Sequence, residues 1–397
     1  LDLVAERRLE IRRLERHEDV DRDLNTSRGV IAGRQDMRGD VIPGFGGYAL
    51  NDAREVRALR DDESVRDYLE ARGQLDGAHE MRGVTFGRYV RAMVLGPQNE
   101  AERRALAVGT DSAGGYTVPA VLSSVLIDRL RTQTHVLRAG ARMVPLASDQ
   151  HAFARIASDP VPAWRGEGQQ VTESEPTFER ILFKPKSLAF LVKASRELLE
   201  DNAVNLESAL PQIFARAFAA ELDRVALFGS GQDNEPVGIA TALDVAGVNT
   251  VTLGTGAGGE LVDYGPILDV RRLILEGNAP EPTDAIMSPR TGRVIAGFSD
   301  STGQPLRRPP ALESMNFRET TQVPDDEEVG SANNASRIII GGFRSLWIGV
   351  RTEMRVEVLK ERYADTLQYG FLCWARYDVN FEHLAPFGQV KGIIPGT

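Results

Sequence analysis

Three glycines in the spacing Gly-x-Gly-x-x-Gly are the feature of this sequence that comes nearest to a cofactor site: Gly254, Gly256 and Gly259. They follow a β-branched stretch and precede a helical pattern, which is the order found in a dinucleotide-binding turn. There the glycines let the backbone approach a pyrophosphate at a helix N-terminus, and an acid after the next strand binds the ribose. Here the next predicted strand ends in Ser288 and Pro289, and the helix begins late. The sequence therefore favours a plain glycine-rich turn.

Other residue types that carry chemistry lack the spacing that it needs. The five histidines have no metal-ligand spacing, and the sequence contains neither a Gly-x-Ser-x-Gly motif nor a phosphate loop with its lysine. The acidic run at 325–328 is typical of a solvated loop. Cys373, the single cysteine, lies in an apolar stretch and is expected to pack as a small hydrophobic residue. We therefore expect no enzyme activity, no cofactor and no metal site.

Length and composition indicate an ordinary globular protein. The 397 residues are 42% hydrophobic and 26% charged, which is enough for two or three domains with buried cores. Apolar runs are too short to span a membrane and the opening residues are too charged for a signal peptide, so we expect synthesis in the cytoplasm and no membrane partner. The net charge of -10 disfavours tight or sequence-specific binding of nucleic acid, because neutralising phosphates requires clustered lysine and arginine.

The chain changes character near residue 105. Residues 1–105 carry helical patterns separated by glycine-rich breaks, and Thr85 is a predicted N-cap of one of these helices. We expect this block to be an appendage rather than part of a core. After it, apolar periodicity predicts a helix at 121–130 and two long strands at 151–156 and 178–194.

A long helical pattern follows at 205–228, with Pro211 inside it. Because proline has no amide hydrogen, the helix is expected either to start late, near Ser208, or to kink. The next stretch, 229–341, is a mixed α+β insertion with helices predicted at 264–276 and around 290–298. The remainder alternates apolar and other residues with a period of two, which predicts strands up to the C-terminus.

The two long strands flank a polar tip, rich in proline and glycine, that has little to contribute to a core. Ordering about twenty residues costs roughly 20–40 kcal/mol of backbone entropy, and an isolated two-stranded hairpin does not recover that in water. The tip is therefore either a flexible surface loop or an arm that lies across another subunit. Trp164 favours the arm, because a monomer would have no reason to expose it.

Mixed charges on the same tip suit a wet contact between subunits, where they set register more than strength. We expect this contact to be made by Trp164, Arg165, Glu167, Glu173 and Glu175. No catalytic, cofactor-binding or metal-binding residue is predicted alongside them.

A series of short stretches, taken together, resembles a known protein family. They are AGGYTVP at 113–119, AWRGEG at 163–168, KASRELLED at 193–201, AELDRVALFGSG at 220–231, MSPR at 287–290 and RYD at 376–378. Each is weak alone, but in this order the chain resembles the tailed-phage major capsid proteins of the Hong-Kong-97 fold.

The resemblance implies an α+β fold with a spine helix, peripheral and axial domains, an extended β-hairpin loop and a helical N-terminal arm. The implied division is as follows: 1–105 a helical scaffold-like segment or long N-arm, 106–120 the arm leading into the core, 121–149 with 187–229 and 342–375 the peripheral domain, 150–186 the extended loop, and 230–341 with 376–397 the axial domain.

The function that the resemblance implies is a structural one. Subunits would assemble with one another as hexamers and pentamers into an icosahedral shell around double-stranded DNA, with a portal and decoration proteins as further partners and the virion as location. One alternative is a protein compartment of the same fold, like an encapsulin. Another, from a different class, is the nucleotide-dependent enzyme to which Gly254, Gly256 and Gly259 point.

Two departures from the family matter. Some relatives link subunits through an isopeptide bond between a loop lysine and an asparagine, aided by a glutamate. Here residues 151–183 contain no lysine, and residues 362–374 contain no asparagine and carry Trp374 where the glutamate would lie, so we expect no covalent cross-link. In many relatives an N-terminal helical segment acts as a scaffold and is cut off at maturation, and the sequence leaves open whether the N-terminal block is removed or retained here.

Overall fold

The computed structural model describes residues 57–59, 63–71, 83–109, 120–146, 150–158, 164, 177–195, 203–254, 256–300, 302–351, 355–359 and 361–395. The chain divides into two compact units. The first comprises residues 1–58 and 151–182, and the second comprises residues 59–150 and 183–397. Each unit is taken by itself below.

The first unit contains a two-stranded sheet, β2 (His151–Ser158) with β3 (Thr177–Phe183). The sequence pattern at 178–194 predicts one strand, and that prediction is wrong, because β3 ends before Pro185 and a separate strand begins after it. Proline cannot donate a ladder hydrogen bond, and the Lys184 amide donates to the Asp378 carboxylate instead (2.7 Å). The hairpin predicted around Trp164 therefore has β2 and β3 as its stem.

A five-stranded sheet forms the first layer of the second unit. Its strands are β1 (Arg142–Leu146), β4 (Lys186–Ser195), β11 (Leu346–Arg351), β12 (Arg355–Leu359) and β13 (Gln368–Phe381). The long strand β13 pairs with β4 along one edge and with β12 and then β11 along the other. Its alternate residues Phe371, Cys373 and Ala375 are buried, as the period-two pattern predicts.

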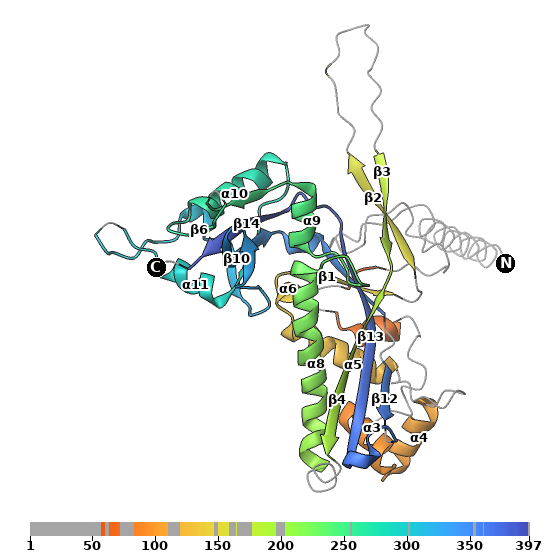
Figure 1. Cartoon of the computed structure of the whole chain (residues 1–397). Helices are drawn as coiled ribbons and strands as arrows, with labels where there is room; N and C mark the ends of the chain where they lie inside the picture. The colour runs from red at the N-terminus through yellow and green to blue at the C-terminus, as the bar shows by residue number, and fades with distance from the viewer. Residues whose placement is uncertain are drawn as a thin grey trace, which may run out of the picture. The chain divides into compact units, whose positions relative to one another are not determined.

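The spine helix α8 (Ala203–Phe228) packs against this sheet and lies alongside β4 and β13 in Figure 1. Phe190 of β4 contacts Phe214 and Phe218 of the helix, with ring centroids 5.4 Å and 4.8 Å apart. Pro211 is accommodated inside the helix, and the predicted late start near Ser208 is wrong, since the helix begins at Ala203.

Five further helices accompany the spine helix: α2 (Val65–Ala71), α3 (Phe86–Leu95), α4 (Glu100–Gly109), α5 (Ala120–Gln133) and α6 (His135–Arg138). Thr85 caps α3 by accepting a hydrogen bond from the Arg88 amide, which confirms the predicted cap. Helices α2 to α4 bury Tyr68, Tyr89 and Ala105, respectively, in the same core as α5 and α8. The described part of residues 59–105 is thus part of the main body, where the sequence pattern favoured an appendage.

Polar contacts fasten these N-terminal helices. The Asp128 carboxylate of α5 accepts a hydrogen bond from the Val65 amide at the start of α2 (2.8 Å), and Arg131 donates to the Glu63 carbonyl (2.5 Å). Upstream of α2, the Leu59 amide donates to the Met143 carbonyl of β1 (2.8 Å). A residue distant in sequence therefore caps α2 and holds it in place.

A seven-stranded sheet forms the second layer, in the order β5-β14-β10-β7-β8, with β6 beside β14 and β9 beside β10. Its strands are β5 (Thr250–Thr252), β6 (Gly259–Glu260), β7 (Asp284–Met287), β8 (Asn316–Glu319), β9 (Glu327–Val329), β10 (Ala332–Gly341) and β14 (Phe387–Ile394). Helices α9 (Ile239–Ala246), α10 (Gly265–Glu276) and α11 (Pro289–Ala296) accompany it, which confirms the helices predicted at 264–276 and near 290–298.

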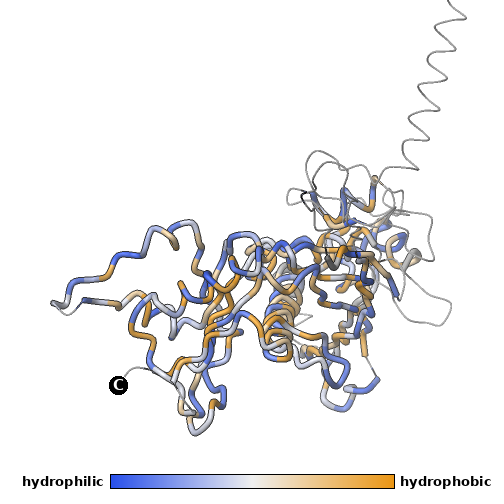
Figure 2. Tube along the Cα trace, turned by 90° about the horizontal axis from the view of Figure 1, so that it is seen from above, coloured by the Kyte–Doolittle hydropathy of each residue, from blue (hydrophilic) through white to orange (hydrophobic). Residues whose placement is uncertain are grey.

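Two hydrophobic cores follow from these layers. The larger core contains the spine helix, the five-stranded sheet and the N-terminal helices, and the second, around Ile274, Ile338 and Val390, lies in the seven-stranded sheet. Short 3-10 turns connect elements at Pro310–Leu312, Phe343–Ser345 and Ala364–Thr366. In Figure 2 the hydrophobic residues gather along the packed strands and helices and the hydrophilic ones mark many of the outer turns.

One expected limit of the axial domain falls inside a strand. A boundary between residues 375 and 376 would cut β13, which continues in the five-stranded sheet to Phe381. Only β14 of the C-terminal residues joins the seven-stranded sheet, through pairing with β5, β6 and β10.

Candidate assembly surfaces

The β2–β3 hairpin presents apolar side chains to solvent. Ile156 is 43% exposed and Phe178 is 51% exposed, and Trp164 is fully exposed at 104%. Among the described residues, none of those at 151–182 belongs to either hydrophobic core. An ion pair fixes the stem, with Arg155 Nε donating to Glu179 Oε2 at 3.0 Å. The stem therefore buries Phe153 and Ile181 while the hairpin exposes other apolar side chains.

Of the five side chains expected at a subunit contact, the structure describes Trp164 alone. The other four, Arg165, Glu167, Glu173 and Glu175, lie outside the described residues. Trp164 is exposed in the single chain, so it is accessible to another subunit. The contact itself stays a prediction.

The glycine-rich turn has a structural explanation. Residues 254–259 lead into β6, and α10 begins only at Gly265, so the strand–turn–helix arrangement of a dinucleotide site is missing from this described part of the chain. A Cβ on Gly330 would lie 1.7 Å from the Gly256 carbonyl oxygen, and the Ser331 amide donates to that oxygen at 3.0 Å. The turn at Gly330 thus packs backbone on backbone against the loop, which is why glycine is needed there.

The connection from the spine helix to α9 is a tight hairpin built around Glu235. Its carboxylate accepts hydrogen bonds from the Ser230 amide (2.8 Å) and hydroxyl (2.6 Å) and pairs with Arg224 of α8. Lys186 of β4 donates to the Glu235 carbonyl at 2.6 Å. Burial alone would raise the pKa of Glu235, but the Ser230 hydrogen bonds and the Arg224 charge outweigh it and lower that pKa.

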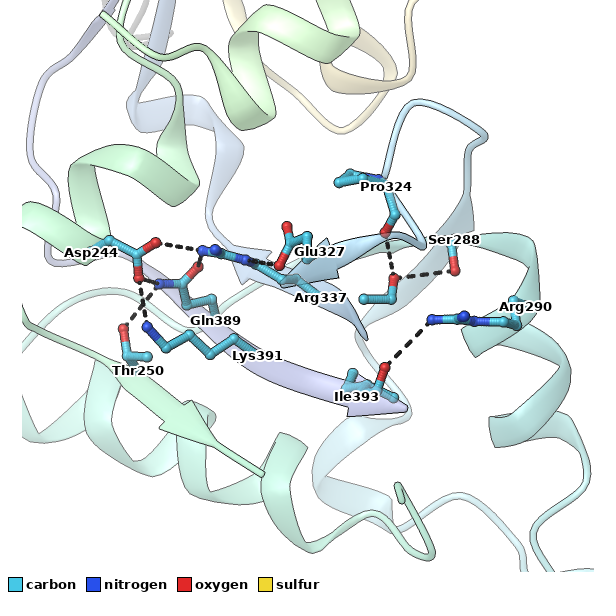
Figure 3. A network of polar contacts seen from close by, with 11 residues as sticks. Asp244, Thr250, Ser288, Arg290, Pro324, Glu327, Arg337, Gln389, Lys391 and Ile393 are labelled. Carbon is cyan, nitrogen blue, oxygen red and sulfur yellow. Dashed lines mark hydrogen bonds and ion pairs between the residues drawn. The ribbon is translucent and has the colours of Figure 1, made fainter. Parts of the chain in front are cut away.

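A polar network joins α9 to the seven-stranded sheet (Figure 3). Its centre is Arg337 of β10, which donates to Asp244 of α9 at 2.6 Å and to the Gln389 side-chain oxygen at 3.1 Å, and forms a short ion pair with Glu327 of β9. Arg337 lies where the register between β10 and β14 shifts, next to Ser336.

Two residues of β14 complete this network. The Gln389 amide nitrogen donates to Asp244 at 2.9 Å and to the Thr250 hydroxyl at 3.2 Å, and the Lys391 ammonium donates to Asp244 at 3.1 Å. Burial opposes ionisation of Asp244, yet Arg337 and Lys391 lower its pKa, whereas burial prevails at Glu327 and raises its pKa. The network contains two acids, Asp244 and Glu327, and two bases, Arg337 and Lys391, so each acid has a basic partner.

A second set of contacts in Figure 3 lies at the start of α11. The Ser288 side chain caps this helix through the Thr291 amide (3.2 Å), the Ser336 hydroxyl donates to the Pro324 carbonyl (2.9 Å), and Arg290 donates to the Ile393 carbonyl (3.4 Å). These contacts position a helix end and a loop. Like the Arg337 network, they join strands of the seven-stranded sheet to a neighbouring helix and loop.

Buried ionisable groups elsewhere also have structural partners. Asp223 of α8 accepts hydrogen bonds from the amides of His135 and Val136 (2.8 and 2.9 Å) and so caps α6; burial raises its pKa. Burial likewise raises the pKa of the Cys373 thiol to about 12, as expected for a packed hydrophobic residue. Within the described ranges, no cluster of His, Cys, Asp or Glu could hold a metal ion, and no helix is long and apolar enough to cross a bilayer.

Sequence reasoning missed the Arg337 network and the docking of α2 to α4. Gln389 and Asp244 are separated by 145 residues, and Val65 and Asp128 by 63. The one local signal is the capping pattern at Ser288, Pro289 and Thr291, which sequence rules for helix starts could have identified.

Comparison with known proteins shows which proteins this chain is similar to. The phage capsid family matches residues 114–391. The chain is 25% identical, over 306 residues that cover 72% of it and 68% of the relative, to the major capsid protein of Klebsiella oxytoca phage phiKO2. Among solved structures, Mycobacterium phage Adephagia gives a TM-score of 0.53 at 16% identity, over 66% of this chain and 90% of that one. The capsid of a native GTA particle gives a TM-score of 0.52 at 20% identity, over 65% of this chain and 90% of that one.

The chain belongs to the phage capsid family. It is a major capsid protein, a structural subunit of a capsid shell, and its α+β fold is the Hong-Kong-97 type expected from the resemblance. The spine helix, the two sheets and the extended hairpin described above are the parts of that fold.

Proposed function

We propose that copies of this chain assemble as hexamers and pentamers into an icosahedral shell that encloses double-stranded DNA, each extended loop lying over a neighbouring subunit. The observation that carries the proposal is the β2–β3 hairpin, whose Ile156 and Trp164 are exposed and belong to neither core. Covering such side chains contributes roughly 25 cal/mol per Å² of apolar surface. In the proposed shell a neighbouring copy covers these two side chains.

The charge of the chain supports enclosure of DNA without sequence-specific binding. A net charge of -10 gives no general attraction for phosphates. A shell that later releases its genome gains nothing from holding it tightly. We propose the virion as the location of the assembled protein, the host cytoplasm as the place of assembly, and a portal and decoration proteins as further partners.

We also propose that the subunit has no enzymatic activity and takes no cofactor. The Gly256 carbonyl is packed against the turn at Gly330, and Gly254 lies against the backbone of Gly258, which supports a structural role for these glycines. Cofactor-dependent thermal stabilisation of the purified protein would instead favour the nucleotide-dependent enzyme.

The N-terminal block keeps its proposed scaffold-like or arm role for the part that precedes Leu59. From Leu59 onward the described residues pack in the main body through α2, α3 and α4. A mass spectrum of the subunit from DNA-filled particles, compared with empty ones, distinguishes removal of the block from its retention.

Electron microscopy of the purified protein tests the proposed function. We expect closed particles with five-fold and six-fold rings of subunits and with nuclease-protected DNA inside. Particles filled with protein cargo and free of DNA would favour the encapsulin-like alternative. A compact monomer in dilute solution, with Trp164 fluorescence already shielded from solvent, would overturn the proposal.

A further inference from the structure

A cavity of about 160 Å³ lies between the C-terminal half of the spine helix and the five-stranded sheet. Leu222 and Val225 of α8 line one side, and Leu188 of β4 with Tyr377 and Val379 of β13 line the other. These side chains belong to the larger hydrophobic core or pack against it. An apolar cavity of about 150 Å³ is large enough for one benzene molecule. The cavity therefore has room for a molecule with a single ring.

The apolar wall carries one hydrogen-bonding group, the Tyr377 hydroxyl. It is buried and has no hydrogen-bond partner among the described residues. Burial raises the pKa of Tyr377, so the hydroxyl stays protonated and can both donate and accept a hydrogen bond. The ring packs on Phe218 of α8, with centroids 5.9 Å apart, which holds it in place. Because a buried hydroxyl without a partner is unfavourable, a ligand that supplies one is favoured.

The charged residues around the cavity are already paired. The Lys186 ammonium donates to the Glu235 carbonyl at 2.6 Å. The Arg224 guanidinium donates to the Glu221 carboxylate at 2.6 Å and pairs with the Glu235 carboxylate. A charged ligand would have to displace one of these partners or stay unpaired in an apolar cavity, and both are unfavourable. The lining therefore favours a neutral ligand.

An apolar ring suits this lining better than water does. A buried water molecule makes about three hydrogen bonds, whereas the apolar wall offers the single hydroxyl of Tyr377. Removing a ring from water and placing it against Leu188, Leu222 and Val225 is favourable in proportion to the apolar surface covered. Exposed Ser187 and Asn234 also line the cavity, so a ligand can reach it from solvent.

We infer that this cavity binds one small neutral molecule with a single apolar ring and one hydrogen-bonding group, of the class of the phenols, and that the Tyr377 hydroxyl pairs with that group. The cavity lies within one subunit, so the inference goes beyond the proposed assembly and does not depend on it. A ligand in this place contacts both α8 and the five-stranded sheet. It binds the folded state and therefore stabilises the subunit.

Calorimetric titration of the purified full-length protein with phenol and with toluene tests the inference. The two probes share a ring and differ in the hydroxyl, and each is expected to bind once per subunit. Tyr377→Phe is expected to weaken phenol binding at least about five-fold, because the phenol hydroxyl then stays buried without a partner. Toluene binding is expected to stay unchanged. Tyr369→Phe, the same substitution in the same strand but outside the cavity lining, is the matched control and should change neither affinity.

A second variant fills the cavity. Val225→Phe is expected to abolish binding of both probes, because its ring occupies their place. Thermal melting of each variant without ligand confirms that it folds. If Val225→Phe does not fold, the contrast between Tyr377→Phe and Tyr369→Phe still decides the question.

Three results would overturn the inference. Failure of both probes to bind the unmodified protein would show that the cavity takes water only. Phenol binding of equal strength in Tyr377→Phe and in the unmodified protein would show that the hydroxyl does not pair with the ligand. Binding of either probe that survives in folded Val225→Phe would place the ligand elsewhere on the subunit.

Discussion

The Arg337 guanidinium lies 2.6 Å from the Asp244 carboxylate and so ties the central strand β10 of one sheet to α9, the helix that follows the spine helix. The same guanidinium pairs with Glu327 in the hairpin partner β9. Arg337 and Glu327 are both largely buried, with 17% and 13% of their side chains exposed. One side chain thus neutralises two acids from separate elements.

Replacing Arg337 with alanine is expected to destabilise the subunit by about 3 kcal/mol, because Glu327 would stay buried without its cation. The free energy of unfolding is measured by urea denaturation of purified capsomers. Arg272→Ala serves as control, since Arg272 and Glu276 form a solvent-exposed pair within one helix, and exposed pairs contribute little to stability. Equal losses from the two variants would contradict a special role for Arg337.

The hairpin at Glu235 predicts an acid-sensitive contribution to stability. Because the folded state lowers the pKa of Glu235 below its ordinary 4.5, its contribution is fully present above pH 4.5 and is lost as the pH falls through the lowered folded value. Glu235→Gln is therefore expected to melt earlier than the unmodified protein at pH 7 and to approach it at strongly acid pH. Melting curves across pH measure this, with Glu276→Gln as an exposed control; a gap between the two proteins that is independent of pH would disprove the linkage.

Adjacent residues of β13 are expected to respond in opposite ways. The buried Tyr377 hydroxyl has no hydrogen-bond partner among the described residues, so Tyr377→Phe should leave stability unchanged or raise it by up to about 1 kcal/mol. Asp378→Ala should cost about 2–3 kcal/mol, because the Lys184 and Val379 amides and the Asn380 side chain lose their acceptor. Chemical denaturation of both variants checks the contrast, and a Tyr377→Phe loss as large as that of Asp378→Ala would show that the hydroxyl has a partner.

Subunits are expected to separate completely when particles are boiled in detergent and reductant. The segment 151–183 has no lysine, and by the resemblance we expect Trp374 at the position where linked relatives carry a glutamate. The structure pairs Trp374 with Ala189 and Arg355 in the five-stranded sheet, which puts no carboxylate at that register position. Gel electrophoresis should give one monomer band, and a ladder of linked subunits would be the contrary result.

Local patterns in the sequence determined many of the elements. The period of two along β13, the helical period in α10 and the Thr85 cap of α3 were all predictable, because side-chain direction repeats with the backbone geometry and a cap needs only its neighbours. The ordered short stretches from residue 113 to 378 likewise predicted the family and the fold class.

Only the tertiary structure decided which elements share a core. Helices α2 to α4 have apolar faces that any partner could cover, and it is Asp128 and the α5–α8 surface that hold them in the body. The Arg337 network joins residues from α9, β9, β10 and β14, and Pro185 divides one apolar stretch between two sheets. The physical reason is the same in each case: burial and ion pairing depend on residues that are close in space and far apart along the chain, and no local period records that distance.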